Sequence, residues 1–266
     1  MLPEHQNLLS WVCTDEYGTR HATLLDPADI SSEDAALKAQ VAIEAGSRMI
    51  LIGGSTDTPE EKVHSMVKTV QEALELRLWA TTQDTEEDED LWKVPVILFP
   101  GGAHALSSSA DGILFMMLMN SRNPKFLVDE QVSGAIWLHE AGIEMLPTGY
   151  VICEPGGKVG EIGEANLLST EEEIRSYAIC AKGFGMKILY LEAGSGALTS
   201  VSSDFIKAAK SIENCLFVGG GIRSAEQAKI AKDAGASWIV TGTIIEEHED
   251  LNELRQTLSE LISGLN

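Results

Sequence analysis

Short apolar runs rich in β-branched residues alternate with amphipathic helical segments along almost the whole chain. Apolar runs without polar alternation are typical of strands buried on both faces, in parallel sheets that helices cover. The alternation therefore predicts an α/β fold, a (β/α)8 barrel of the TIM type. At 266 residues, the chain has the usual length of one such barrel, so we expect a single domain over residues 1–266. The predicted strands are His21–Leu25, Arg48–Ile52, Val94–Phe99, Gly112–Met117, Glu144–Cys153, Lys187–Leu191, Cys215–Val218 and Trp238–Val240.

One connection breaks the pattern. Only twelve residues, Pro100–Asp111, separate the third and fourth predicted strands, and they are rich in Gly and Ser. This segment is too short for two loops and an ordinary helix. We therefore expect the third crossover helix to be missing or replaced by an extended segment, which would open one side of the barrel top. The acidic, polar stretch Thr81–Trp92 predicts an exposed loop or insertion.

Composition excludes several classes of partner. The formal net charge of −22 argues against nucleic acid, because phosphate backbones are bound by Lys and Arg. No run of eighteen apolar residues is present, which predicts no transmembrane segment, and the first residues lack the pattern of a secretory signal. The four cysteines have no paired spacing and predict reduced core residues. We expect a cytoplasmic protein.

Three turns of small residues directly follow the last three predicted strands. They are Gly194–Gly196, Gly219–Gly221 and Gly242–Thr243. Small residues after a strand let backbone N–H groups approach an anion closely, and in a barrel these turns meet at one face. The sequence therefore predicts a single phosphate site, with Gly194–Gly196 closing over it. Arg223 is either a phosphate partner or a surface residue.

Several longer motifs, in their order along the chain, resemble those of the geranylgeranylglyceryl phosphate synthase family. That family transfers a long prenyl group from its diphosphate to sn-glycerol 1-phosphate, using Mg²⁺, in the synthesis of archaeal ether lipids. The resemblance implies a Mg²⁺-dependent prenyltransferase that forms an ether lipid precursor and pyrophosphate and assembles as a homo-oligomer. The matching segments are Thr23–Pro27, Ile52–Ser55, Val96–Gly101, Thr148–Gly156, Tyr190–Ala197, Gly219–Arg223 and Thr241–Thr243.

The resemblance also implies roles for particular residues. Asp26 and Ser55 are expected to supply oxygen ligands to Mg²⁺, and Glu192 is expected to accept the proton of the attacking glycerol hydroxyl. Simpler roles stay open: Asp26 and Ser55 as turn residues, Glu192 as a buried structural carboxylate, Tyr190 as a core aromatic. The predicted substrate-binding residues are Tyr190, Leu191, Glu192, Ala193, Gly194, Ser195, Gly196, Gly220, Gly221, Gly242 and Thr243.

The chain departs from the family at one point. The family often has a lysine after the first strand, in the pattern Asp-Pro-Asp-Lys, whereas this chain reads Asp26-Pro-Ala-Asp29. A diphosphate contact of that lysine is therefore in question, and Arg20 and His21 are the candidates to replace it.

Two further alternatives concern the lipid chain and the reaction. The apolar run Phe115–Met119, with Trp137 and Leu138, lines either a prenyl groove or an ordinary core. The rival functions are a sugar-phosphate isomerase or aldolase and a non-catalytic phospholigand-binding barrel. A Schiff-base aldolase needs a lysine at a strand end. Lys187 starts its predicted strand, which weighs against that rival.

Overall fold

Eight parallel strands form a closed barrel in sequence order in the computed structural model, which describes residues 7–54, 58–83, 89–212 and 215–265. Strand β1 pairs with both β2 and β8, which closes the sheet. The predicted barrel is therefore confirmed. The strands are β1 Arg20–Leu25, β2 Met49–Gly53, β3 Val96–Phe99, β4 Gly112–Leu118, β5 Glu144–Ile152, β6 Ile188–Glu192, β7 Cys215–Gly219 and β8 Trp238–Thr241.

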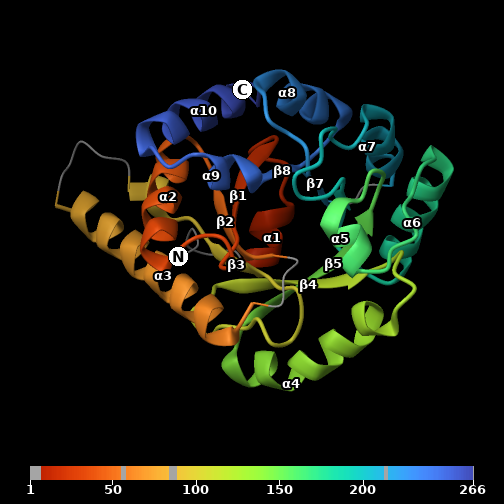
Figure 1. The fold of residues 1–266 in the computed structure, drawn as a ribbon, viewed down its shortest axis with the longest axis horizontal. Helices are drawn as coiled ribbons and strands as arrows, with labels where there is room; N and C mark the ends of the chain where they lie inside the picture. Colours follow the sequence, from red (N-terminus) through yellow and green to blue (C-terminus); the bar gives the residue numbers. More distant parts are fainter. Residues whose placement is uncertain (1–6, 55–57, 84–88, 213–214, 266) are drawn as a thin grey trace.

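Helices ring the barrel on its outer side (Figure 1). The bounds are α2 Ser32–Glu44, α3 Glu60–Thr81, α4 Glu130–Ala141, α6 Glu171–Gly183, α7 Ser203–Lys210, α8 Ala225–Ala234 and α10 Leu251–Ser263. A 3₁₀ turn, η1 Glu89–Trp92, follows α3, and a π-helical turn, η2 Lys125–Asp129, leads into α4. Residues 100–111 form only turns and bends. The third crossover helix is absent, as the short connection predicts.

Side-chain oxygens cap several of these helices where the sequence places Ser, Thr or Asp. The Ser31 hydroxyl accepts from the Asp34 N–H, and Thr170 and Glu173 form a full capping box before α6. The start of α3 differs from expectation. Thr58 with Pro59 at the first helical position predicts a capping box, but Pro59 is the N-cap, the helix begins at Glu60 and no side chain caps it. The extended ψ of 142° at Pro59 keeps that residue outside the helix.

Aromatic rings stack through the barrel interior. Tyr150 and Tyr190 stack with ring centroids 5.0 Å apart, and Phe99 meets both rings edge-on. Phe217 contacts Tyr190 and stacks on Trp238 at 5.6 Å. Such pairs stabilise beyond the area that they bury. The interior is thus packed from its base up to Tyr190, and open space begins above that ring.

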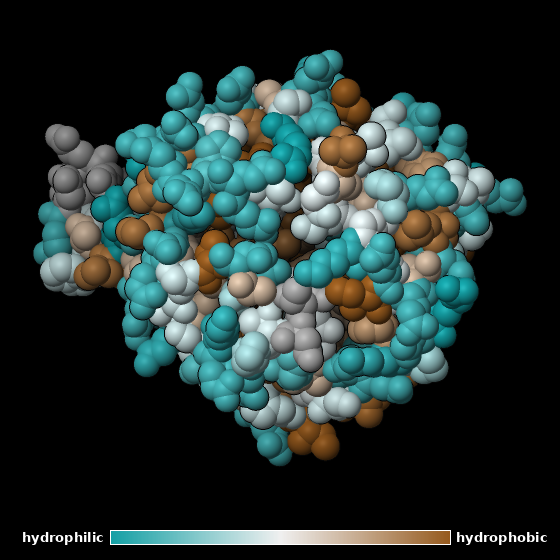
Figure 2. Space-filling model, viewed as in Figure 1, coloured by the Kyte–Doolittle hydropathy of each residue, from teal (hydrophilic) through white to brown (hydrophobic). Residues whose placement is uncertain are grey.

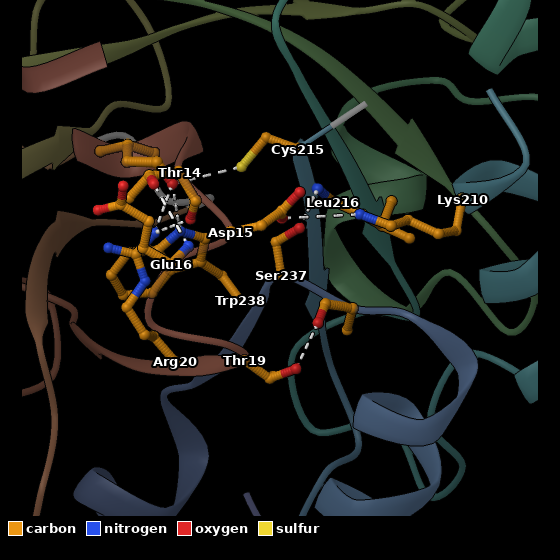
Figure 3. Close-up of polar contacts among 12 residues, drawn as sticks. Thr14, Asp15, Glu16, Thr19, Arg20, Lys210, Cys215, Leu216, Ser237 and Trp238 are labelled. Atoms are coloured by element: carbon orange, nitrogen blue, oxygen red, sulfur yellow. Dashed lines mark hydrogen bonds and ion pairs between the residues drawn. The ribbon is translucent and has the colours of Figure 1, made fainter. Parts of the chain in front are cut away.

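A short helix, α1 Leu8–Cys13, closes the base of the barrel and was not predicted. The Val12 carbonyl accepts hydrogen bonds from Arg20 Nη2 at 2.8 Å, Trp238 Nε1 at 2.9 Å and Cys215 Sγ at 3.5 Å (Figure 3). The Arg20 guanidinium also lies over the Trp238 ring, 4.1 Å from its centroid. The contacts of the Val12 carbonyl therefore join α1 to β1, near the start of the chain, and to β7 and β8, near its end.

The molecular surface is mainly hydrophilic, as Figure 2 shows for one face. The formal charge of −22 is consistent with that surface. Among the described helices, none combines the length and the apolar character that a membrane crossing requires.

Candidate active site at the carboxyl ends of the strands

A cavity opens at the carboxyl ends of the strands, above the aromatic stack. Its polar part is lined by residues that follow β1, β6, β7 and β8, and its apolar part extends between β4 and α4. Figure 2 shows its mouth as a hollow near the middle of the face. The polar lining includes Asp26, Tyr190, Glu192, Ser195, Gly220, Gly221, Thr241, Gly242 and Thr243. Most of the residues predicted from the sequence therefore meet in one cavity.

The turns after β7 and β8 present free backbone donors to this cavity. Within the part of the chain that the structure describes, the N–H groups of Gly220, Gly221, Gly242 and Thr243 donate no hydrogen bond. The positive φ angles of Gly220 and Gly221, 82° and 70°, belong to the region that favours glycine. Unpaired N–H groups in half-buried turns that line one cavity suit the binding of an anion. Arg223 also lines the cavity, where its Nη1 contacts both Glu247 carboxylate oxygens at 2.9 and 2.8 Å.

Glu192 ends β6 with its carboxylate inside the cavity and only 6 % of the residue exposed. Burial raises its pKa to about 7, against the opposing effect of hydrogen bonds from the Gly194 N–H and the Tyr190 hydroxyl. The Gly194 N–H lies 2.6 Å from Glu192 Oε1. The pKa of Tyr190 is raised well above 10, first by burial and then by the Glu192 charge, so its phenol stays protonated and donates. Glu192 can therefore exchange a proton near neutral pH while two donors hold it in place.

Asp26 follows β1 and is half-buried at the cavity wall. Its Oδ1 accepts from the Ala28 N–H at 2.8 Å. Oδ2 points at Gly54, where an added Cβ would lie 1.9 Å from it, so any side chain at position 54 would force this carboxylate to move. Burial raises the Asp26 pKa, the Ala28 bond and the Lys158 charge lower it, and Asp29 raises it.

This carboxylate suits a Mg²⁺ ion, which takes one or two carboxylates together with phosphate oxygens and water. Asp26 lines the cavity, and among the described residues no group donates to its Oδ2, so this oxygen has lone pairs to give to a cation. Within the described residues, no group of three or more acidic, His or Cys side chains could hold a metal without other ligands. The second predicted ligand, Ser55, lies outside the described residues.

The apolar part of the cavity runs sideways between β4 and α4. Its side chains come from β4, from the helical segment after it and from α5 Gly157–Ile162: Phe115, Met116, Leu118, Phe126, Leu138 and Val159. Trp137, which the sequence also suggests, does not line it and is 37 % exposed on α4. A groove of this kind fits a long hydrocarbon chain.

Some predicted residues lie elsewhere. Leu191 and Ala193 point away from the barrel interior and pack in the layer between barrel and helices. Gly194 contributes its N–H to Glu192 but does not line the cavity, and neither does Gly196. The alternation of side chains along β6 explains Leu191, because its neighbours Tyr190 and Glu192 face inward.

Neither candidate for replacing the missing lysine reaches the cavity. Arg20 lies at the base, bonded to the carbonyls of α1. His21 is 1 % exposed in the outer layer, with Nδ1 at 2.7 Å from Ser47 Oγ and Nε2 at 2.9 Å from Thr241 Oγ1. Burial lowers the His21 pKa to about 3, so its ring is neutral.

Other cavity residues were missed by the sequence reading. Tyr150 stacks on Tyr190, and its place in the motif Thr148–Gly156, in register with β6, is the signal that could have identified it. Glu246, in α9 Thr243–Glu247, lines the cavity near Asp26. Glu130 of α4 accepts from the Ala103 N–H at 2.6 Å and so ties residues 100–111 to α4. No local pattern marks these two carboxylates.

A closed parallel barrel with unpaired N–H donors after its last strands defines the class of phosphate-binding (β/α)8 barrels. Comparison with known proteins narrows this class. The sequence pattern of the PcrB family matches residues 80–260, and the chain belongs to that family. A geranylgeranylglyceryl phosphate synthase of Methanococcoides burtonii is 42% identical over 252 residues, which cover 93% of this chain and 94% of that protein.

Further relatives agree with that likeness. The synthase of the same name from Thermococcus sibiricus is 39% identical, over 92% of this chain and 90% of its own length. The crystal structure of (S)-3-O-geranylgeranylglyceryl phosphate synthase from Thermoplasma acidophilum superimposes with a TM-score of 0.87 at 32% identity, covering 98% of both chains. That structure contains the substrate sn-glycerol-1-phosphate.

Proposed function

We propose that this protein transfers a geranylgeranyl group from its diphosphate to the C3 hydroxyl of sn-glycerol 1-phosphate, releasing pyrophosphate. One observation carries the proposal: a buried carboxylate with a pKa near 7 lies between a cradle of free N–H donors and an apolar groove. The cradle suits a phosphate, the groove suits a prenyl chain, and the carboxylate suits a hydroxyl proton. The names of the relatives and the substrate in the Thermoplasma structure support the same reaction.

In this proposal, the N–H groups of Gly220, Gly221, Gly242 and Thr243 bind the phosphate of glycerol 1-phosphate. They set its C3 hydroxyl against Glu192, which accepts the proton as the new C–O bond forms. The Tyr190 hydroxyl keeps the Glu192 carboxylate oriented. Carbocation character at the allylic carbon is stabilised by the prenyl skeleton, so the protein contributes mainly position and charge.

We also propose that the reaction depends on Mg²⁺, with Asp26 as its carboxylate ligand. When bound there, the ion would neutralise charge on the pyrophosphate as it leaves. Asp26 itself holds the orientation that the Ala28 bond and the close contact with Gly54 impose. Asp26→Asn should therefore abolish the binding of Mg²⁺ in calorimetry while the affinity for glycerol 1-phosphate is retained.

Lys158 is our candidate for the cation that the first-strand motif lacks. It belongs to α5, and the next residue, Val159, lines the cavity. The positive charge of Lys158 acts on Asp26, whereas the other nearby lysine, Lys38, donates to the Ile245 carbonyl at 2.7 Å. We propose that Lys158 contacts the diphosphate.

We also propose that the enzyme is cytoplasmic and works as a homo-oligomer.

The decisive test removes one donor of the cradle. Thr243 is the first residue of α9, a position at which proline is tolerated because its N–H has no helical partner. Thr243→Pro deletes that N–H, and Thr243→Ala keeps it as the matched control. We expect the KM for glycerol 1-phosphate to rise at least several-fold in the proline variant alone. Equal KM values in the two folded variants, or no prenylated product from wild type, would contradict the proposal.

The aldolase alternative has no support at this site. In the part of the chain that the structure describes, no lysine lines the cavity. Lys187 precedes β6, and its charge acts on Cys13 at the base of the barrel. A Schiff base cannot form across that distance.

A further inference from the structure

Two cysteines from opposite ends of the chain meet at the base of the barrel. Cys13 is the last residue of α1, and Cys215 is the first residue of β7. Cys215 Sγ lies 3.5 Å from the carbonyl oxygen of Val12, the residue before Cys13, and the two thiols are close enough for each to shift the pKa of the other. Figure 3 shows the Cys215 side chain pointing from its strand toward Thr14, on the other side of Cys13 in sequence.

The two thiols differ in their surroundings. Cys13 is partly exposed, whereas Cys215 is buried. The neighbouring Cys215 thiol lowers the pKa of Cys13, and the positive charges of Arg20 and Lys187 lower it further, against burial and Asp15. Cys215 keeps its proton, because the neighbouring Cys13 sulfur and burial raise its pKa. A partly exposed thiol of lowered pKa beside a protonated, buried thiol is the arrangement of an oxidant-sensitive cysteine and its resolving partner.

We propose that Cys13 and Cys215 form a redox-active pair, oxidised by hydroperoxides to a reversible disulfide that fastens α1 to β7. The Cys13 thiolate attacks a peroxide oxygen, the O–O bond breaks, and the departing hydroxide or alkoxide takes a proton. Sulfur is thereby oxidised by two electrons to a sulfenic acid. Cys215 sulfur then attacks Cys13 sulfur, the S–O bond breaks, and water leaves with the Cys215 proton.

The base of the barrel makes this link possible without moving the cavity. The Val12 carbonyl is already held by Arg20, Trp238 and Cys215, so α1 has one fixed position against β7 and β8. The cavity lies at the opposite ends of the strands, beyond the aromatic stack. The disulfide would close a covalent loop of most of the chain and so restrict the unfolded state.

The chain contains its own controls. Cys180 is exposed and Cys153 is buried, and burial raises the pKa of Cys153 to about 12. Thiolate character, rather than mere exposure, should decide which cysteine reacts. Cys180 therefore reports the reactivity of an ordinary exposed thiol, and Cys153 that of an inert buried one.

The experiment treats the full chain with hydrogen peroxide, alkylates the remaining thiols and analyses tryptic peptides by mass spectrometry. We expect Cys13 to be consumed about tenfold faster than Cys180, and a linked Cys13–Cys215 peptide that dithiothreitol abolishes. In Cys215→Ser, dimedone should capture the sulfenic acid on Cys13. The melting temperature of wild type should rise on oxidation, and that of Cys13→Ser should not.

Two outcomes would overturn the proposal. One is reaction of Cys13 no faster than Cys180. The other is accumulation of Cys13 sulfinic acid with free Cys215, which would mean that the thiols cannot reach bonding geometry. Both readouts are independent of prenyl transfer. Cys180→Ser should behave as wild type in every measurement, so that a general effect of losing a thiol is separated from loss of the pair.

Discussion

Glu192 combines burial with two hydrogen-bond donors, and this balance sets its chemistry. Burial disfavours the ionised form of the carboxylate and so raises its pKa. The hydrogen bonds from the Gly194 N–H and the Tyr190 hydroxyl stabilise the ionised form and partly offset that effect. The resulting pKa of about 7 leaves the side chain ready to accept a proton at neutral pH. Its role in the reaction can be tested separately from its role in stability.

Glu192→Gln should lower kcat by roughly 10²–10⁴ with little change in either KM, because the amide keeps the shape but cannot accept the hydroxyl proton. Single-turnover kinetics isolate the bond-forming step. In wild type, kcat/KM should rise with pH around a midpoint near 7, as Glu192 of the free enzyme ionises. A variant with a normal single-turnover rate from about pH 6 to 9 would reduce Glu192 to an orienting residue.

The same group makes the free energy of unfolding depend on pH. The Glu192 pKa is about 7 in the folded chain, above its ordinary 4.5, so the folded state binds more protons between these values. Its contribution to stability is therefore full below 4.5 and is lost as pH rises to 7, by about 3 kcal/mol. Urea unfolding from pH 4.5 to 8 should give a smaller decline for Glu192→Gln. Parallel profiles would show that the carboxylate is not buried.

For single residues, the sequence predicts the site best where a reactive residue type occupies a strand position whose side chain faces the barrel interior. The sequence predicts that three residues face the cavity: Asp26, Tyr190 and Glu192. Each is a polar or aromatic residue at or just after the end of a strand, in a position that faces the barrel interior. Leu191 is predicted as a substrate-binding residue only because it belongs to the same motif. Its position between two inward-facing residues directs its side chain to the outer side of the barrel. Tyr150 and Glu246 were missed because their importance depends on which strands and helices become neighbours.

Among the elements, residues 100–111 do the most to shape the cavity. No helix covers this stretch, so the wall between β3 and α4 consists of turns. Glu130 holds them, with Oε2 2.6 Å from the Ala103 N–H and Oε1 3.4 Å from Lys125 Nζ. The bond to Ala103 is charge-assisted and partly buried, so its loss costs about 1–3 kcal/mol.

Glu130→Ala should raise the KM for the prenyl diphosphate several-fold and leave that for glycerol 1-phosphate unchanged. The reason is that Gly102 and Ala103 line the apolar side of the cavity, away from the phosphate turns. Steady-state kinetics with each substrate varied in turn make the measurement. Glu140→Ala, an exposed carboxylate on the same helix, is the control. Equal changes in both KM values would mean that Glu130 supports the whole fold instead.

The absence of a third helix could be predicted from length alone, whereas α1, α5 and α9 could not be predicted. Each of these helices has only five or six residues, too few for a helical period to be visible. They form because the barrel offers them partners: the α1 carbonyls meet Arg20, and the Gly156 N–H before α5 donates to the Ala193 carbonyl. Tertiary contacts of this kind leave no local pattern.

On the surface of the molecule, two large apolar side chains of α4 are exposed to solvent. Val132 and Ile136, one turn apart on α4, are 67% and 73% exposed. If the proposed homo-oligomer uses this face, Val132→Glu with Ile136→Glu should lower the mass measured by light scattering. Ile230→Glu, on α8, is the matched control at 48% exposure. An unchanged mass in the double variant would exclude α4 from the interface.

The eight-stranded barrel itself followed from the alternation of apolar runs and helices, and strand bounds differ by few residues. Val94 and Pro95 were assigned to the third strand but precede β3, since the ladder with β2 starts at Val96. The pattern of apolar runs does not predict how the sheet closes into a barrel or how the base of the barrel is covered. Closure depends on contacts between β1 and β8, and between α1 and β7, that span most of the chain.

Those contacts bear on the order in which the protein is completed during synthesis. The first helix can contact Arg20 and Glu144 early, but the Val12 carbonyl also binds donors at residues 215 and 238, so its docking is complete only when nearly all of these residues have left the ribosome. The opening at the base is thus the last part of the barrel to be sealed, by a helix that precedes all eight strands in the sequence. A nascent chain halted before β8 would leave the Trp11 ring and the Val12 carbonyl without their Trp238 partner, so this apolar segment should stay uncovered until β8 has been made.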